Sequence, residues 1–264
     1  MSDNQVQNPG GMSSIGYLFS QSWVIYKKKF WQLIGMSLLP GLVGFVGGFL
    51  AAIIAIVVGL TGNAKAVYIT LIIVFGLLAI AGFLFLVFLS VSASAATYIL
   101  VRDNEKDVSL KNAFMEGARY FWRFLIISLL LGIIIMLWTL LFIIPGIIFG
   151  LYYSFAAWVL INEQKEDMSA LRRSKELVKK HWWAVFGRLF ILLLPIYLIM
   201  FVPMIGQSKE FVESWNNIIS LLSIIIGPFA LIYSWLIYKD LVRIKDGVAS
   251  NNPMVADNVS VGEN

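Results

Sequence analysis

Five long stretches of the chain contain no Asp, Glu, Lys or Arg, and the charged residues gather in the segments between them. These stretches are residues 30–64, 66–101, 124–162, 189–208 and 214–238. Each is long enough for at least one helix across a bilayer, which needs about 20 apolar residues. None shows the alternation of polar and apolar positions that is typical of strands in a membrane barrel. The pattern therefore predicts membrane-spanning helices.

The number of spans follows from the positions of the basic residues, because cytoplasmic segments carry the excess of Lys and Arg. If residues 66–101 cross once and residues 124–162 cross twice, all twenty Lys and Arg residues except Lys65 and Lys209 lie on one side. Pro145 and Gly146 divide the second of these stretches, since Pro lacks a donor N–H and Gly tolerates turn dihedrals. The six predicted spans are residues 33–60, 68–100, 124–144, 146–161, 189–205 and 216–238.

The composition narrows the class of protein. Of the 264 residues, 59% are apolar and 13% are charged, whereas soluble domains have roughly 45–50% apolar and about 25% charged residues. We expect a multi-pass membrane protein with both termini in the cytoplasm. Residues 1–14 and 246–264 are rich in Asn, Ser, Gly and Asp, so they are predicted to be disordered tails flanking a membrane domain at 15–245.

Each of the three main basic segments ends in a pair of aromatic residues that leads into a predicted span. The pairs are Phe30-Trp31, Phe121-Trp122 and Trp182-Trp183. An amphipathic stretch precedes each pair, with residues spaced by three and four as on one face of a helix. Positions 12, 9 and 6 residues before the second aromatic are Phe19, Ser22 and Ile25 in the first segment and Leu171, Ser174 and Leu177 in the third, and Leu110 and Ala113 keep the first two offsets in the second.

These stretches predict helices that lie in the cytoplasmic membrane interface, with apolar faces in the acyl boundary and basic residues toward anionic headgroups. Asp107 or Ser109 could cap the second helix and Ser169 the third. The predicted fold is an all-α polytopic membrane protein made of three repeats, each an amphipathic interfacial helix followed by a transmembrane hairpin. The alternative is that basic loops beside spans acquire Lys and aromatic residues for anchoring alone.

The candidate contacts with the phospholipid bilayer are the basic and tryptophan side chains of these segments. They are Lys27, Lys28, Lys29, Trp31, Arg119, Trp122, Arg172, Arg173, Lys179, Lys180, Trp182 and Trp183. The net charge of +5 therefore indicates anionic lipid headgroups as partners. A nucleic-acid partner is not expected, because that would need a soluble basic surface.

Hydroxyl-bearing residues cluster within two of the predicted spans. They are Ser90, Ser94 and Thr97 in the second span and Tyr152, Tyr153 and Ser154 in the fourth. One interpretation is a polar groove that holds a lipid headgroup, and the other is close packing between helices.

The sequence contains no complete catalytic or metal-binding motif. His181 is the only histidine, cysteine is absent, and neither a Gly-Lys-Ser/Thr loop nor a Gly-x-Ser-x-Gly elbow occurs. We therefore expect no catalytic residue, metal or cofactor. Glu163 and Glu166 are expected to form ion pairs with Arg172, Arg173 or Lys175 rather than a metal or acid–base site.

Residues 144–194 resemble a bacterial membrane domain. The resemblance rests on Ile144-Pro145-Gly146, Tyr152-Tyr153, Glu163, Ala170-Leu171-Arg172-Arg173-Ser174, Leu177-Val178-Lys179-Lys180 and Trp182-Trp183. This pattern is similar to the membrane domain attached to some glycerophosphoryl diester phosphodiesterases and to its free-standing six-span relatives. Members of that family commonly have Gly where His181 stands here. The resemblance implies a membrane domain of the bacterial cytoplasmic (inner) membrane without the hydrolase, which is a separate soluble barrel in that family.

Two functions remain open on the sequence. The first is a non-enzymatic inner-membrane protein that acts as an accessory or scaffold for lipid or envelope processes through its basic interfacial helices, with a membrane or envelope protein as a possible partner. The alternative is a transporter or lipid-translocating protein that uses the polar groove between the second and fourth spans. The spans contain no Asp, Glu, Lys, Arg or His, which counts against ion-coupled transport.

Overall fold

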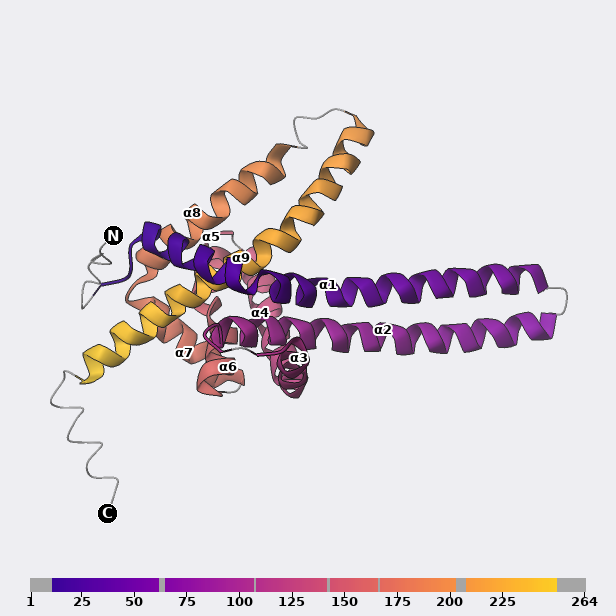
Figure 1. The fold of residues 1–264 in the computed structure, drawn as a ribbon, viewed down its shortest axis with the longest axis horizontal. Coiled ribbons are helices and arrows are strands. Elements are labelled where there is room, and N and C mark those ends of the chain that lie inside the picture. The colour runs from indigo at the N-terminus through magenta and orange to yellow at the C-terminus, as the bar shows by residue number, and fades with distance from the viewer. Residues whose placement is uncertain are drawn as a thin grey trace, which may run out of the picture. The chain divides into compact units, whose positions relative to one another are not determined.

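The computed structural model describes residues 11–61, 65–106, 108–141, 143–165, 167–202 and 208–250, and these segments are helical apart from short connections. In chain order the helices are α1 (Ile15–Thr61), α2 (Lys65–Arg102), α3 (Leu110–Arg119), α4 (Phe121–Leu141), α5 (Ile143–Tyr153), α6 (Ala156–Glu163), α7 (Asp167–Lys179), α8 (Trp182–Phe201) and α9 (Lys209–Ser250) (Figure 1). The prediction of an all-α protein is confirmed over the described residues.

Six helical segments are long and apolar enough to cross a membrane, as the sequence predicts. They are Ile15–Ile54, Ile73–Arg102, Phe121–Leu140, Ile144–Glu163, Trp182–Ile199 and Glu210–Gly247. Because these segments together leave many large apolar side chains exposed, and soluble proteins rarely expose apolar patches of this extent, the chain is a multi-pass membrane protein.

The described residues form two compact units, and each helix is assigned to one of them except α1 and α4, which are divided. The hairpin unit comprises Phe30–Phe124, and the helical-core unit comprises the described residues up to Lys29 and from Leu125 onward.

In the hairpin unit the later part of α1 runs beside α2 (Figure 1), and Leu86 lies 3.7 Å from the position a Cβ atom would take on Gly44. At ~1.5 Å per residue, the stretch from Trp31 to the end of α1 at Thr61 is ~45 Å long. That length matches a bilayer of ~40–45 Å with its headgroup regions.

The short helix α3 packs tightly against the last third of α2. Ala113 is fully buried, and a Cβ atom on Gly117 would lie 2.5 Å from the backbone oxygen of Ser92 and 2.7 Å from the backbone nitrogen of Ala96. Only a residue without a Cβ atom allows the two backbones to approach this closely. The small residues on the apolar face of α3 are therefore used for packing against protein, whereas the sequence predicts that this face enters the acyl boundary.

Both ends of α3 are fixed by hydrogen bonds. Ser109 is the N-cap, as predicted, because its hydroxyl accepts a hydrogen bond from the backbone N–H of Asn112 at 3.3 Å. The other predicted cap, Asp107, lies outside the described residues. At the other end Tyr120 is the single residue between α3 and α4, and its carbonyl accepts the backbone N–H of Phe124 at 2.8 Å.

In the helical-core unit the fourth predicted span is not one helix. Its first part belongs to α5, which begins at Ile143 and continues through Pro145 and Gly146, and a Cβ atom on Gly146 would lie 2.5 Å from the Thr139 hydroxyl. A break separates α5 from α6. Ser174 of α7 bridges this break, since its hydroxyl donates to the carbonyl of Tyr152 at 2.8 Å and accepts the backbone N–H of Phe155 at 3.2 Å.

The core of this unit is formed by α6 against α7 and α9. Residues 155–161 are all buried. Trp158 packs against Trp235 with ring centroids 4.8 Å apart, and its indole N–H donates to the Ser234 hydroxyl at 3.0 Å. The first turns of α1 add Tyr26, whose hydroxyl donates to the carbonyl of Ile225 in α9 at 2.9 Å.

Several predicted boundaries differ from the structure. Residues 19–25 do not form a separate interfacial helix, because α1 continues through them into the first span. Ser169 lies inside the first turn of α7 rather than at its N-cap. Residues 246–250 of the predicted C-terminal tail belong to α9.

The end of the predicted N-terminal tail is also ordered. Arg188 of α8 donates to the carbonyl of Ser13 at 2.7 Å, and the backbone N–H of Ser13 donates to Asp240 of α9 at 2.8 Å. Arg243 reaches the carbonyl of Gly11 at 3.4 Å. Side chains far along the chain thus satisfy the backbone groups that precede α1.

Candidate functional site

The three aromatic pairs that lead into the apolar helices have similar local geometry. The rings of Phe30 and Trp31 are 5.3 Å apart at 78°, those of Phe121 and Trp122 are 5.1 Å apart at 70°, and those of Trp182 and Trp183 are 4.7 Å apart at 89°. Edge-to-face contact of this kind is favourable for aromatic side chains. In each pair the first ring therefore restricts the orientation of the second.

The second residue of every pair is an exposed tryptophan. Trp31 is 81% exposed, Trp122 is 69% exposed and Trp183 is 77% exposed. Large aromatic side chains are rarely left uncovered by protein, and tryptophan is enriched where a membrane protein meets the headgroups. These three side chains are available to the bilayer.

The helical segments before the pairs share a buried face. Nine residues before each exposed tryptophan stands a small, fully buried residue, and these are Ser22, Ala113 and Ser174. One helical turn later stands a second buried residue, and these are Tyr26, Gly117 and Val178. The same two positions of each segment thus pack against protein.

Most of the predicted basic contacts are exposed. This group comprises Lys27, Lys28, Arg119, Arg172, Lys179 and Lys180. Lys29 differs because it is buried, with 4% of its surface exposed. The Arg173 side chain is only 15% exposed, and it pairs with Glu163 at 3.0 Å and with Asp246 at 3.3 Å.

Glu163 is the centre of an ion-pair network in the helical-core unit. Besides Arg173 it pairs with Lys165 at 3.0 Å, and it accepts a hydrogen bond from the Tyr238 hydroxyl at 3.2 Å. The expected pairing of Glu163 is confirmed for Arg173, and the position of Glu166 lies outside the described residues. Over the part of the chain that the structure describes, no group of three His, Cys, Asp or Glu side chains could hold a metal ion.

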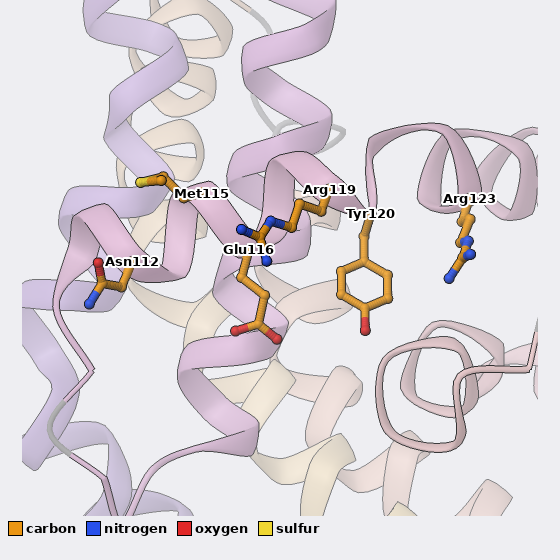
Figure 2. Close-up of a pocket in the computed structure, with 6 residues that line it drawn as sticks. All are labelled: Asn112, Met115, Glu116, Arg119, Tyr120 and Arg123. Carbon is orange, nitrogen blue, oxygen red and sulfur yellow. The ribbon is translucent and has the colours of Figure 1, made fainter.

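A polar pocket of about 600 Å³ lies in the hairpin unit where α3 meets α4. We call it the arginine pocket; its lining residues are Asn112, Met115, Glu116, Arg119, Tyr120 and Arg123 (Figure 2). Figure 2 shows the Tyr120 ring between the two arginines, with its hydroxyl pointing the same way as the Arg123 guanidinium. Of these residues, sequence reasoning singled out only Arg119, because the pocket depends on the turn at Tyr120.

The acidic residues around the arginine pocket already have cationic partners. Arg102 pairs with Glu116 at 2.9 Å and with Asp103 at 2.8 Å, and Lys106 lies 3.7 Å from Asp103. The hydrogen bond from Arg102 lowers the pKa of Asp103 below its usual value. Among the described residues no acidic side chain lies within ion-pairing distance of Arg119.

The hydroxyl groups of the predicted polar groove make local hydrogen bonds. Ser94 donates to the carbonyl of Ser90, Thr97 donates to that of Ala93, and Ser154 donates to that of Leu151. These bonds stay within one helix or turn and are typical of hydroxyls in apolar helices. The carbonyl of Tyr152 accepts the Ser174 hydroxyl.

The hydroxyl-bearing residues of the two predicted groove walls belong to different units. Ser90, Ser94 and Thr97 are part of the hairpin unit, and Tyr152, Tyr153 and Ser154 are part of the helical-core unit. Tyr153 lies near Phe149, with ring centroids 6.1 Å apart. The groove therefore stays a prediction.

Comparisons with protein-family models, with curated proteins and with solved structures found no match. The resemblance to the phosphodiesterase-associated membrane domain stays a prediction.

Proposed function

We propose that this multi-pass protein acts without catalysis at the bacterial cytoplasmic membrane, where its basic face holds anionic phospholipid for lipid or envelope processes. The observation that carries this proposal is the set of three exposed tryptophans, Trp31, Trp122 and Trp183. Each follows a segment with exposed basic side chains. Tryptophan at the headgroup level combined with Lys and Arg favours contact with an anionic membrane surface, with each nearby cation contributing about 1 kcal/mol.

The proposed topology places both termini and the three basic segments in the cytoplasm. It is supported by the distribution of basic residues, of which only Lys65 and Lys209 fall on the other side. We further propose that the fold repeats three times, as a basic helical segment followed by an apolar hairpin. The support is the shared pattern of a buried small residue nine positions before an exposed tryptophan.

The accessory or scaffold role is favoured over a transporter for a specific reason. The hydroxyls of Ser94, Thr97 and Ser154 are engaged by backbone carbonyls of their own segments, so none of them has to be matched by a polar cargo. A protein partner from lipid or envelope metabolism completes the proposal, in line with the resemblance to a membrane domain that accompanies a phosphodiesterase.

Lipid retention tests the proposal. The full chain is purified from membranes that contain phosphatidylglycerol and phosphatidylethanolamine, and the retained lipids are measured by mass spectrometry. We expect enrichment of phosphatidylglycerol in the wild type and its loss when Lys27, Arg172, Lys179 and Lys180 are replaced by Gln.

The control replaces Lys65 and Lys209 by Gln, the two basic residues that the proposal assigns to the opposite side, and it should keep the enrichment. Equal loss in both sets, or no enrichment in the wild type, would refute the proposal. A periplasm-only reporter that becomes active when it is fused after Lys245 would refute the topology.

A further inference from the structure

We propose that the arginine pocket is a binding site for a phosphate group, supplied by an anionic phospholipid headgroup or by a soluble phosphate ester. The inference deepens the proposed function, and it rests on that function only for the lipid as the source of the phosphate. The proposed function requires only a general attraction between basic side chains and an anionic membrane, whereas this inference assigns phosphate binding to one pocket with named side chains. Its volume of about 600 Å³ lies within the ~300–1,000 Å³ of ordinary small-molecule sites.

The backbone that carries the arginine pocket is held in place by several contacts. The close contact of Gly117 with the backbone of Ser92 fixes α3 on α2, and Ser109 caps its start. A single residue, Tyr120, then joins α3 to α4, and Phe121 packs on Phe88 of α2 with ring centroids 5.0 Å apart. The arginines at either side of Tyr120 are therefore carried by backbone that is already ordered, which lowers the entropic cost of binding a ligand.

The chemistry of the lining residues selects an anion. Arg119 supplies a guanidinium group, whose planar fork matches two oxygens of a phosphate, and Arg123 adds a second positive charge to the lining. Tyr120 and Asn112 add an O–H and an N–H donor. The one carboxylate in the lining, Glu116, pairs with Arg102 at 2.9 Å, so its charge is already balanced.

The position of the pocket along the chain points to the phosphate level of a bilayer. The apolar segment Phe121–Leu140 begins between the two arginines, and the exposed Trp122 lies at its start. Tryptophan and arginine at the end of an apolar helix are typical of the headgroup region. A phospholipid phosphate at this depth would meet the arginines without leaving the membrane.

The test compares two charge removals on the same short helix. Arg119→Gln removes a lining residue of the arginine pocket, whereas Lys111→Gln removes an exposed cation of α3 that lines a different, apolar cavity. The full chain is placed in phosphatidylcholine nanodiscs with increasing phosphatidylglycerol, and bound lipid is counted by native mass spectrometry. In a second arm inorganic phosphate is titrated calorimetrically into phosphatidylcholine nanodiscs.

We expect saturable binding whose apparent Kd rises about tenfold in Arg119→Gln and less than about twofold in Lys111→Gln. Arg119→Lys keeps the charge but loses the fork, so it should fall between them, and all three variants should unfold at the wild-type temperature. Phosphatidylglycerol binding with this pattern identifies the lipid as the source. Phosphate binding with this pattern, without competition from phosphatidylglycerol, identifies a soluble phosphate ester.

Equal weakening in Arg119→Gln and Lys111→Gln would overturn the site while leaving a general preference for anionic lipid, and with it the proposed function, intact. Absence of any phosphatidylglycerol enrichment, together with Arg119-dependent phosphate binding, would keep the site and remove the proposed function. If neither probe shows dependence on Arg119, the inference is wrong.

Discussion

The packing of α3 against α2 makes a strong prediction for Gly117→Ala. The added methyl group would lie 2.5 Å from the Ser92 carbonyl oxygen and 2.7 Å from the Ala96 nitrogen, whereas non-bonded heavy atoms prefer ~3.5–4.0 Å. Both neighbours are backbone atoms of a long helix, so the strain cannot be relieved by a side-chain rotation. The short helix α3 must move away by roughly 1 Å, which separates the backbones it was packed against.

Two effects oppose each other in this variant. Overpacking of a close contact costs ~1–3 kcal/mol, while the replacement of Gly by Ala in a helix returns about 0.5–1 kcal/mol. Because both close neighbours are backbone atoms, the cost should fall in the upper part of its range, at ~2–3 kcal/mol, so α3 is docked less firmly by ~1–2 kcal/mol. Since 1.4 kcal/mol corresponds to a factor of ten, the backbone amides of α3 should exchange with solvent about 5–30 times faster.

Hydrogen exchange of the full chain in nanodiscs, read by mass spectrometry on peptides from α3, measures this effect. Gly82→Ala is the matched control, because a Cβ atom on Gly82 of α2 would meet nothing within 4 Å. That variant should leave the exchange of α3 unchanged. Unchanged or slower exchange in Gly117→Ala would mean that helix propensity outweighs the contact, and the packing argument would fail.

Three further outcomes follow from other contacts. Ser174→Ala removes the hydroxyl that satisfies the buried N–H of Phe155 and the part-buried carbonyl of Tyr152 at the break between α5 and α6, and it should lower the free energy of unfolding by ~1–3 kcal/mol. Ser154→Ala, at an exposed hydroxyl, should lower it by less than ~0.5 kcal/mol. Because Arg102 lowers the pKa of Asp103, Asp103 contributes stability that is complete above about pH 4 and is lost as the pH falls through the lowered pKa. The unfolding midpoint, measured as a function of pH, should show this loss in the wild type, and Asp103→Asn should abolish this part of the pH dependence. Arg188→Gln removes the donors to the backbone before α1, so limited proteolysis should cut that segment faster, and an unchanged rate would contradict the contact.

The features that the sequence predicts well are those set by transfer between water and lipid. Six apolar helices follow from the absence of charge in long runs, because a charged side chain in hydrocarbon is costly. The cap at Ser109 follows from local chemistry, since its hydroxyl satisfies a backbone group only three residues away. The first feature depends on the composition of a whole segment, and the second depends on residues that are only three positions apart.

The features that sequence reasoning missed depend on contacts between distant segments. The break between α5 and α6 carries no Gly or Pro signal, and Ser174 satisfies it from about twenty residues further on. The arginine pocket likewise needs the turn at Tyr120, and the burial of Lys29 follows from tertiary packing rather than from the polarity of Lys. Hydropathy reports which segments are apolar, but not which backbone atoms will meet.

The bridged break between α5 and α6 has a consequence for biosynthesis. Until Ser174 has been synthesised, the carbonyl of Tyr152 and the N–H of Phe155 lack the hydroxyl that satisfies them, and unsatisfied backbone groups are disfavoured in lipid. The fourth apolar segment should therefore not settle in the bilayer as an independent helix when it leaves the ribosome. It should remain at the translocon until α7 has been synthesised, so that α5, α6 and α7 reach their final positions together.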